Sequence, residues 1–280
     1  MCDSVTELNR TVMTGVIHSN DAAAEDFFVM SVAVSDAFQA AMPGQFVMVR
    51  IKGRDFPFLP RPFSIFSVAH EGGTTIIEIL YQVVGKGTKL LSRLGRGDEL
   101  TILGPLGKGF DIRQDRHTIV LIAGGVGIAP LYFLAEYCKG SDDVPEKQTR
   151  IICFMGARTA DYLIGRERLD KICDTLLVST DDGSEGYCGT VTDCFENHIG
   201  SVNVEDSTLY CCGPYLMMQS VARKVRKYSM PCQVSMEARM ACGIGACLGC
   251  SVKMKTDDET VRYLRVCKDG PVFDVAMIDW

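Results

Sequence analysis

The chain has 280 residues, of which 47% are hydrophobic and 23% charged, and its formal net charge is −6. This length allows two or three domains with hydrophobic cores of their own. The composition is ordinary for a globular protein that does not need disulfide or metal cross-links to fold. The acidic balance and the lack of a Lys/Arg-rich block exclude nucleic acid and an anionic membrane surface as the main partner.

The first ten residues are polar and lack the apolar core of a secretory signal, and no apolar run in the sequence is long enough to span a bilayer. We therefore expect a cytoplasmic protein. Thirteen cysteines would suggest disulfides in a secreted chain. Nine of them are scattered, several within apolar runs such as RIICFMG, where a reduced cysteine behaves as a small hydrophobe.

Short β-rich runs separated by turn signals dominate the first part of the chain, which we predict to be a domain of residues 1–112. Six such runs predict a closed antiparallel barrel. The one helical segment that we expect here is GTKLLSRLG, in which Leu90, Leu91 and Leu94 share a face. The runs are TGVIHSN, DFFVMSVAV, GQFVMVRI, FSIFSVAH, TTIIEILYQVV and DELTILG.

From about Arg113 the pattern changes to apolar strands that alternate with helical stretches. Four β-then-α units begin at HTIVLIAGG, RIICFMGA, TLLVST and TLYCCG. This order predicts a doubly wound parallel sheet covered by helices, which binds nucleotides at the carboxyl ends of its strands. We assign residues 113–228 to this α/β domain and expect residues 229–280 to be a small appendage.

The appendage contains the stretch MACGIGACLGC at residues 240–250, with a further cysteine downstream. Its C-x4-C-x2-C…C pattern is the plant-type spacing for a [2Fe–2S] cluster. Two alternatives are a zinc site, which favours two similar C-x2–4-C knuckles, and a pair of disulfides. The glycines and alanine between the cysteines let backbone N–H groups approach sulfur, which favours the cluster. The predicted ligands are Cys242, Cys247, Cys250 and Cys267.

Three further motifs suit phosphate or a heterocycle. The loop GlyGlyValGlyIleAlaPro at 124–130 follows a buried strand and opens a helix, although such a turn can also serve packing alone. ArgProPheSer at 61–64 offers a cation for a diphosphate and a hydroxyl for a heterocycle. GlyLysGlyThr at 85–88 leads into the short helix of the barrel. Each motif taken separately could be a simple turn.

In this order, the RPFS, GGVGIAP and CGP motifs resemble the ferredoxin–NADP reductase superfamily. The C-terminal CGIGACLGC…RVCKDGPVF is similar to one group of its members, the electron-transfer subunits of class 1B dihydroorotate dehydrogenase. The resemblance covers nearly the whole chain and implies FAD in the barrel and NAD on the α/β domain. A terminal aromatic often covers the flavin in relatives, but Trp280 follows the cysteine segment, so we give it no such role.

The resemblance also implies site residues by position. The first flavin motif is matched by Arg61, Pro62, Phe63 and Ser64, the second by Leu80, Tyr81 and Gln82, and the pyrophosphate turn by Gly87 and Thr88. The NAD side would use Gly124, Gly125 and Gly127 together with Cys212, Gly213 and Pro214. For Cys212, a contact with the nicotinamide and a place in the core remain open alternatives.

These parts together indicate an electron-transfer subunit. A nicotinamide exchanges two electrons as hydride and a [2Fe–2S] cluster one at a time, and flavin does both. The family implies the route dihydroorotate, partner FMN, cluster, FAD, NAD⁺, with a separate FMN-bearing catalytic subunit and a heterotetramer of two copies of each. We predict no catalytic acid or base in this chain, because its four histidines are scattered and lack motif context.

Two other functions fit part of the sequence. One is a related flavin/iron–sulfur reductase that serves a different partner, such as a sulfide- or ferredoxin-linked enzyme. The other is a cluster-bearing redox sensor, which would not need both RPFS and GGVGIAP. The choice between NAD and NADP also stays open, since Arg158 after the second α/β strand could meet a 2′-phosphate.

Overall fold

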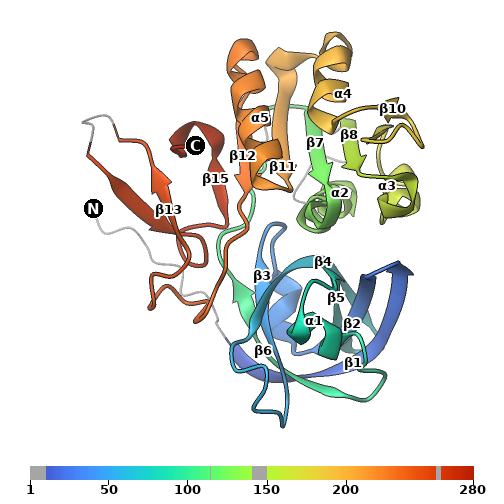
Figure 1. Ribbon diagram of the computed structural model, residues 1–280, viewed down its shortest axis with the longest axis vertical. Helices are drawn as coiled ribbons and strands as arrows, with labels where there is room; N and C mark the ends of the chain where they lie inside the picture. The colour runs from blue at the N-terminus through green and yellow to red at the C-terminus, as the bar shows by residue number, and fades with distance from the viewer. Residues whose placement is uncertain (1–10, 114, 141–149, 257–259) are drawn as a thin grey trace.

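The computed structural model describes residues 11–113, 115–140, 150–256 and 260–280 (Figure 1). In Figure 1 the N-terminal barrel lies below, the parallel sheet with its helices lies above it, and the C-terminal strands lie to the left. Among the described residues, no helix is both long enough and apolar enough to cross a membrane.

The predicted barrel is confirmed, and it closes in the order β1-β2-β5-β4-β3-β6. Every neighbouring pair is antiparallel. Alternating side chains fill the interior, as on β2, where Met30 and Val32 are buried. The strands are β1 (Thr11–Ala24), β2 (Phe27–Val34), β3 (Phe46–Ile51), β4 (Arg61–Glu71), β5 (Thr74–Gln82) and β6 (Glu99–Leu106).

The barrel contains two short helical segments instead of the one predicted. The expected helix is α1 (Lys86–Leu91), whose Leu91 is buried. The additional segment is the 3₁₀ helix η1 (Asp36–Ala40), which inserts Phe38 into the barrel core. Five residues are too few to show a helical period, so the sequence alone did not reveal η1.

The predicted doubly wound sheet is also confirmed. Its strand order is β10-β9-β8-β7-β11-β12-β15, and all neighbouring pairs are parallel except β12 with β15. The central strands are buried on both faces, which is why they read as continuous apolar runs. The strands are β7 (Thr118–Gly124), β8 (Arg150–Ala157), β9 (Thr175–Thr180), β10 (Tyr187–Cys188), β11 (Ser207–Cys212), β12 (Cys232–Ser235) and β15 (Val272–Asp274).

Helices cover both faces of this sheet. Side chains of α2 (Ile128–Gly140) and α3 (Arg166–Asp170) share a core with Ile119 and Leu121 of β7. Those of α4 (Val191–His198) and α5 (Tyr215–Val225) share the opposite core with Val120 and Ile122. Helix α2 also packs on β4, because Phe66 of the barrel belongs to the same core as α2. This helix therefore lies between the sheet and the barrel.

The C-terminal segment is more closely integrated than the expected appendage. Its first strand, β12, extends the nucleotide-binding sheet beside β11, and β15 adds the edge strand. Between them the chain leaves the sheet, forms the cysteine loop, and makes a separate hairpin of β13 (Ser251–Met254) and β14 (Arg262–Arg265). The cysteine loop is thus held at both ends by strands of the large sheet.

Candidate functional site

A cavity of about 370 Å³ opens where the barrel meets the α/β domain. Two antiparallel strands form its barrel side, because the start of β4 and the end of β5 are adjacent. The cavity brings together the predicted residues Arg61, Pro62, Phe63, Ser64, Leu80, Tyr81, Gln82 and Thr88. It is closed by Val126 and Ala129 of the glycine loop and α2, and by residues 235–238 and Met240 of the C-terminal segment.

The guanidinium of Arg61 lies against the first turn of α1. It donates a hydrogen bond to the carbonyl oxygen of Leu59, and a Cβ atom at Gly87 would overlap it. A glycine at position 87 is therefore what lets the cation lie against the turn backbone. This places a positive charge beside backbone N–H groups, an arrangement that suits a diphosphate.

The other predicted barrel residues shape the cavity in different ways. The Thr88 hydroxyl accepts hydrogen bonds from the N–H groups of Val84 (3.0 Å) and Gly85 (3.2 Å), so it stabilises the turn. The Tyr81 hydroxyl donates to Asn20 (2.9 Å), and its ring stacks on Phe28. Burial raises the pKa of Tyr81 to about 12, although the hydrogen bond to Asn20 acts to lower it. Tyr81 is therefore a neutral wall residue.

A second cavity of about 540 Å³ lies at the carboxyl ends of the parallel strands. Gly124 and Gly125 after β7 line it, as do Arg158 after β8, Asp181 after β9 and Pro214 after β11. This is the edge at which open α/β sheets bind nucleotides. Gln82, Val126 and Glu237 line both cavities, so the two cavities share a wall.

Gly127, Gly213 and Cys212 lie behind the wall that the two cavities share. A Cβ atom at Gly127 would overlap the Cys212 carbonyl, and Gly213 packs on Gly124, so the two loops are in direct backbone contact. Cys212 itself is 2% exposed. Burial raises the pKa of its thiol, the charge of Glu237 adds to this, and a hydrogen bond with Ser235 opposes it. Gly127, Cys212 and Gly213 thus support the cavity wall from within.

Glu237 is a site residue that sequence reasoning missed. It lies two residues after the end of β12 and lines both cavities. Within the described ranges its side chain makes no hydrogen bond or ion pair. Its side chain is exposed at the cavities, and the protein atoms packed around it still raise its pKa by partial desolvation. It belongs to no recognisable motif, and only its place after a strand of this sheet could have indicated it.

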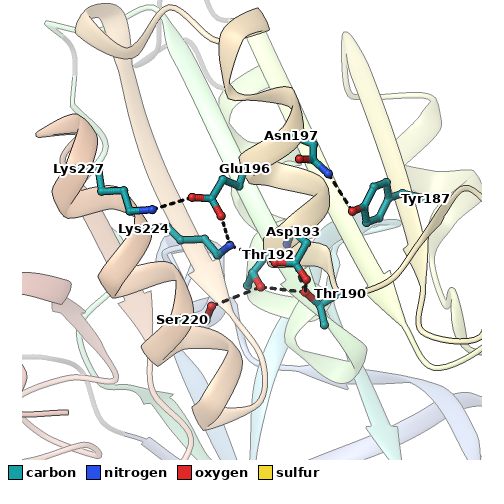
Figure 2. A network of polar contacts seen from close by, with 9 residues as sticks. All are labelled: Tyr187, Thr190, Thr192, Asp193, Glu196, Asn197, Ser220, Lys224 and Lys227. Carbon is teal, nitrogen blue, oxygen red and sulfur yellow. Dashed lines mark hydrogen bonds and ion pairs between the residues drawn. The ribbon is translucent and has the colours of Figure 1, made fainter.

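Helix α4 begins at the rim of the second cavity, and a polar network fixes it to α5 (Figure 2). Thr190 lines the cavity and caps the helix by accepting the N–H of Asp193 (3.2 Å). Lys224 of α5 pairs with Asp193 (3.1 Å) and Glu196, and Lys227 pairs with Glu196 (2.8 Å). The hydrogen bonds with Lys224 and Lys227 lower the pKa of Glu196 to about 2. The network keeps this rim in place.

The four predicted cluster cysteines lie close together as two pairs. Cys242 is hydrogen bonded to Cys247, and Cys267 to Cys250, whose sulfur also accepts the Cys267 N–H at 3.5 Å. In the described part of the chain, no three His, Cys, Asp or Glu side chains converge as ligands of one metal ion. Two pairs suit a centre with two iron atoms better than a single tetrahedral zinc.

Backbone N–H groups surround these sulfurs, as the small residues of the loop predicted. Burial acts to raise the pKa of Cys242, but hydrogen bonds from Ile244, Cys247 and Ala246 outweigh it and lower the pKa to about 6. The Gly245 N–H is directed to Cys267, whose pKa burial and Cys250 raise to about 12. Sulfur ligands that receive backbone N–H donors in this way fit an iron–sulfur cluster.

Two glycines let the cysteine loop fold against its surroundings. Gly243 (φ +71°) and Gly245 (φ +83°) adopt the left-handed region that disfavours residues with a Cβ atom. A Cβ atom at Gly243 would come within 2.5 Å of Met48 Cγ on β3. Met48 in turn pairs with Pro62, inside the first flavin motif. The cysteine loop therefore contacts the barrel beside the predicted flavin site.

Two family models match this chain, one over the α/β domain and one over the C-terminal cysteine segment. Residues 121–223 match the family described as the oxidoreductase NAD-binding domain. Residues 237–279 match the iron-sulfur cluster binding domain of dihydroorotate dehydrogenase B.

Curated relatives carry the name dihydroorotate dehydrogenase B (NAD(+)), electron transfer subunit. The protein from Caldanaerobacter subterraneus subsp. tengcongensis is 40% identical over 231 residues, which cover 82% of this chain and 84% of the relative. The protein from Clostridium acetobutylicum is 38% identical over 82% of this chain and 83% of its own length. The protein from Desulforamulus reducens is 34% identical over 92% and 94% of the two chains.

Solved structures share the fold. An NADH-dependent reduced ferredoxin-NADP oxidoreductase, described in connection with flavin-based electron bifurcation, has a TM-score of 0.81 and 31% identity over 95% of this chain and 90% of its own. A ferredoxin NADP⁺ reductase from Neisseria gonorrhoeae with bound FAD and NADP has a TM-score of 0.64 and 17% identity over 78% and 91% of the two chains, and it shows the fold alone.

Proposed function

This chain belongs to the family of dihydroorotate dehydrogenase B (NAD(+)) electron transfer subunits, as its motifs predicted, and we propose that it passes electrons from a dihydroorotate-oxidising partner to NAD⁺. It does so through a [2Fe–2S] cluster and FAD. The reaction is the dihydroorotate oxidation that the names of the relatives give, and we assign it to pyrimidine biosynthesis.

The observation that carries this proposal is the contiguity of three sites. The flavin-motif cavity and the nucleotide cavity share Gln82, Val126 and Glu237. Met240 lines the first cavity and precedes Cys242 by two residues, a stretch of chain that spans at most about 7 Å. Nucleotide site, flavin site and sulfur ligands therefore lie in series around one short segment, which is what stepwise electron transfer needs.

FAD, when bound, supplies the change from two-electron exchange with nicotinamide to one-electron exchange with the cluster. In our proposal Arg61 and the turn at Gly87 and Thr88 hold its diphosphate, and Ser64 and Gln82 offer hydrogen bonds to its heterocycle. Pro62, Phe63, Leu80 and Tyr81 form the apolar wall. The loops of Gly124, Gly125 and Pro214 accept the nucleotide, with Gly127, Cys212 and Gly213 behind them.

We assign the four cysteines, Cys242, Cys247, Cys250 and Cys267, as the cluster ligands, and the structure supports this through their paired sulfurs and surrounding N–H donors. Glu237 adds a carboxyl, with a pKa raised by desolvation, at the boundary of the two cavities. The domain limits of 1–112, 113–228 and 229–280 remain our assignment of these sites to sequence.

The partner in this proposal is an FMN-containing catalytic subunit, in a heterotetramer of two copies of each chain. The name "electron transfer subunit" of the relatives implies such a catalytic chain. We also assign the protein to the cytoplasm, because none of the twelve cysteines in the described ranges forms a disulfide, as in a reducing compartment. Co-purification followed by native mass measurement tests partner and stoichiometry together.

The decisive experiment separates the two halves of the route. The purified chain should contain FAD and about two iron and two sulfide per chain. Cys250→Ser should remove dihydroorotate-dependent NAD⁺ reduction in the complex but leave NADH oxidation by a dye that accepts directly from FAD largely intact. Loss of both activities with FAD retained, or zinc in place of iron, would contradict the proposal.

A second candidate function has a specific observation in its favour. The NADH-dependent reduced ferredoxin-NADP oxidoreductase structure matches 95% of this chain at 31% identity. A role in ferredoxin-linked transfer predicts that reduced ferredoxin, and not the dihydroorotate-oxidising partner, delivers electrons to this chain. Measuring NAD⁺ and NADP⁺ reduction with each donor in turn distinguishes the two.

A further inference from the structure

A cluster of charged and aromatic side chains joins the barrel to the α/β domain, away from both cavities. Arg168 of α3 binds Glu78 of β5 with both terminal nitrogens, one of them at 3.1 Å from the Glu78 carboxylate. Among the ion pairs between described residues, this is the one that connects the two domains. The hydrogen bond to Glu78 raises the pKa of Arg168, so the guanidinium is always charged.

Aromatic rings hold the same guanidinium from the side. Its central carbon lies 5.1 Å from the centre of the Phe66 ring and 5.8 Å from that of Tyr132, within the range of cation–π attraction. The two rings contact each other at 4.7 Å between centroids. Phe66 belongs to β4 and Tyr132 to α2, so the cation rests on one ring from each domain.

A second contact repeats the connection one residue further along β4. The Ser67 hydroxyl donates to Glu136 of α2 at 2.7 Å, and the Tyr132 hydroxyl donates to the other oxygen of Glu136 at 3.3 Å. Ser67 is buried. These contacts are directional, whereas the apolar packing between β4 and α2 is not.

The two elements that this cluster connects are those that form the cavities. Strand β4 begins with the Arg61–Ser64 motif, three residues before Ser67. Helix α2 begins directly after the glycine loop, and its Ala129 lines the flavin-motif cavity. A change in the angle between β4 and α2 therefore moves the nucleotide loop relative to the flavin motif.

Beside the cluster, a groove separates part of the barrel from part of the α/β domain, and Phe66, Glu78 and Arg168 line it. A groove of about 880 Å³ lies between Asp21, Ala22 and Val29 of the barrel and Ile164, Arg166 and Glu185 of the α/β domain. Side-chain packing cannot resist rotation of the domains across an open groove. The directional contact between Arg168 and Glu78, which lines this groove, can oppose such a rotation.

We propose that Arg168 is a positioning residue, which through Glu78, Phe66 and Tyr132 sets the angle between the barrel and the α/β domain. In this way it aligns a nicotinamide bound at the glycine loop with a flavin bound at β4. This inference rests on the proposed function, since it concerns the alignment of those two groups.

The test compares two arginines of the same groove in the full-length chain. Arg168→Met removes the interdomain pair, whereas the control Arg166→Met removes a pair with Glu185 inside the α/β domain. Stopped-flow reduction of the bound flavin by NADH gives the maximal rate and the Kd of NADH separately. We expect Arg168→Met to lower the maximal rate about tenfold with Kd changed less than about twofold, because misalignment affects the reacting geometry more than binding.

Two further measurements do not depend on turnover. The long-wavelength charge-transfer absorbance of the nicotinamide–flavin pair should weaken in Arg168→Met and persist in Arg166→Met. Small-angle X-ray scattering of the FAD-free and FAD-loaded chains should show a changed interdomain arrangement only in Arg168→Met. If Arg168→Met does not fold, Arg168→Lys keeps the cation without the fork and should reduce flavin at an intermediate rate.

The exchange of charges in Glu78→Arg/Arg168→Glu should recover part of the rate, because it restores the pair between β5 and α3. Arg168→Met behaving as Arg166→Met in rate, absorbance and scattering would overturn the inference, as would Arg168→Lys at the wild-type rate. If instead the wild-type chain does not reduce its flavin with NADH, the proposed function itself is wrong.

Discussion

The contact between the cysteine loop and the barrel gives a sharp test of how the cluster is positioned. In Gly243→Ala, the new Cβ atom would lie 2.5 Å from Met48 Cγ, and Met48 is 1% exposed and cannot swing into solvent. Overpacking of this kind costs about 1–3 kcal/mol. The left-handed backbone at φ +71° costs a residue with a Cβ atom about 1–2 kcal/mol more. The expected total is about 2–5 kcal/mol.

Gly53→Ala is the matched control, because Gly53 has nearly the same backbone angle, φ +72°, but has no atom within 4 Å of an added Cβ. It should cost only the backbone strain, about 1–2 kcal/mol. The difference of about 1–3 kcal/mol corresponds to a shift of between about 2 and 5 °C in the thermal midpoint of a chain of this length.

The assay follows loss of the visible cluster absorbance on heating, with far-ultraviolet circular dichroism recorded in parallel. Gly243→Ala should lose its cluster at a lower temperature than Gly53→Ala, and Gly243→Ala/Met48→Ala should show a coupling energy of about 0.5–3 kcal/mol, because the truncated side chain makes room. Equal midpoints for Gly243→Ala and Gly53→Ala would mean that the loop does not pack on Met48.

Three further predictions concern the two cavities. Arg61→Ala should weaken FAD retention about ten- to a hundredfold, from the loss of a charge-assisted contact of about 1.5–3 kcal/mol, and leave iron content unchanged; unaltered flavin content counts against the assignment. Burial raises the pKa of Glu237 above its ordinary 4.5, so the stability that its protonated form contributes is complete below pH 4.5 and is lost as the pH rises through the raised pKa. Glu237→Gln should therefore match the wild type in thermal midpoint at low pH and exceed it at neutral pH. If the difference in midpoint between the two proteins does not change with pH, the raised pKa of Glu237 is refuted. Asp181→Asn should improve use of NADPH relative to NADH about tenfold by removing a negative charge from the nucleotide cavity, whereas Asp182→Asn, whose carboxylate accepts hydrogen bonds from Ser184, should not.

The sequence predicted those parts of the fold that have a local signal. The barrel strands alternate, the sheet strands are continuous apolar runs, and α2 and α5 show a helical pattern, so their existence and order were recognised. Strands β12 and β15 were not recognised as members of the sheet. They have four and three residues and are separated in the chain by the whole cysteine loop, so only the tertiary structure shows that they pair.

The site residues also divide into those that a local motif predicted and those that only the fold revealed. Motif residues such as Arg61, Ser64 and Gly124 were found because their spacing carries chemical information, and the structure gathers them around two cavities. Glu237 and Arg168 carry no such spacing. Arg168 meets Glu78 across 90 positions of sequence, and Glu237 owes its place to the end of a strand that the sequence did not reveal. Long-range pairs of this kind follow from the fold and cannot be read from a local pattern.

The segment from Glu237 to Cys242 explains why one chain carries all three sites. Glu237 touches both cavities, Met240 lines the flavin-motif cavity, and Cys242 begins the cysteine loop that packs on Met48 beside Pro62. Because the loop is also held at both ends by β12 and β15, a movement of the sheet relative to the barrel shifts the sulfur ligands and the nucleotide loop together. In our proposal the angle between barrel and sheet therefore affects both electron-transfer steps, and contacts across that boundary, such as Arg168 with Glu78, help to set it.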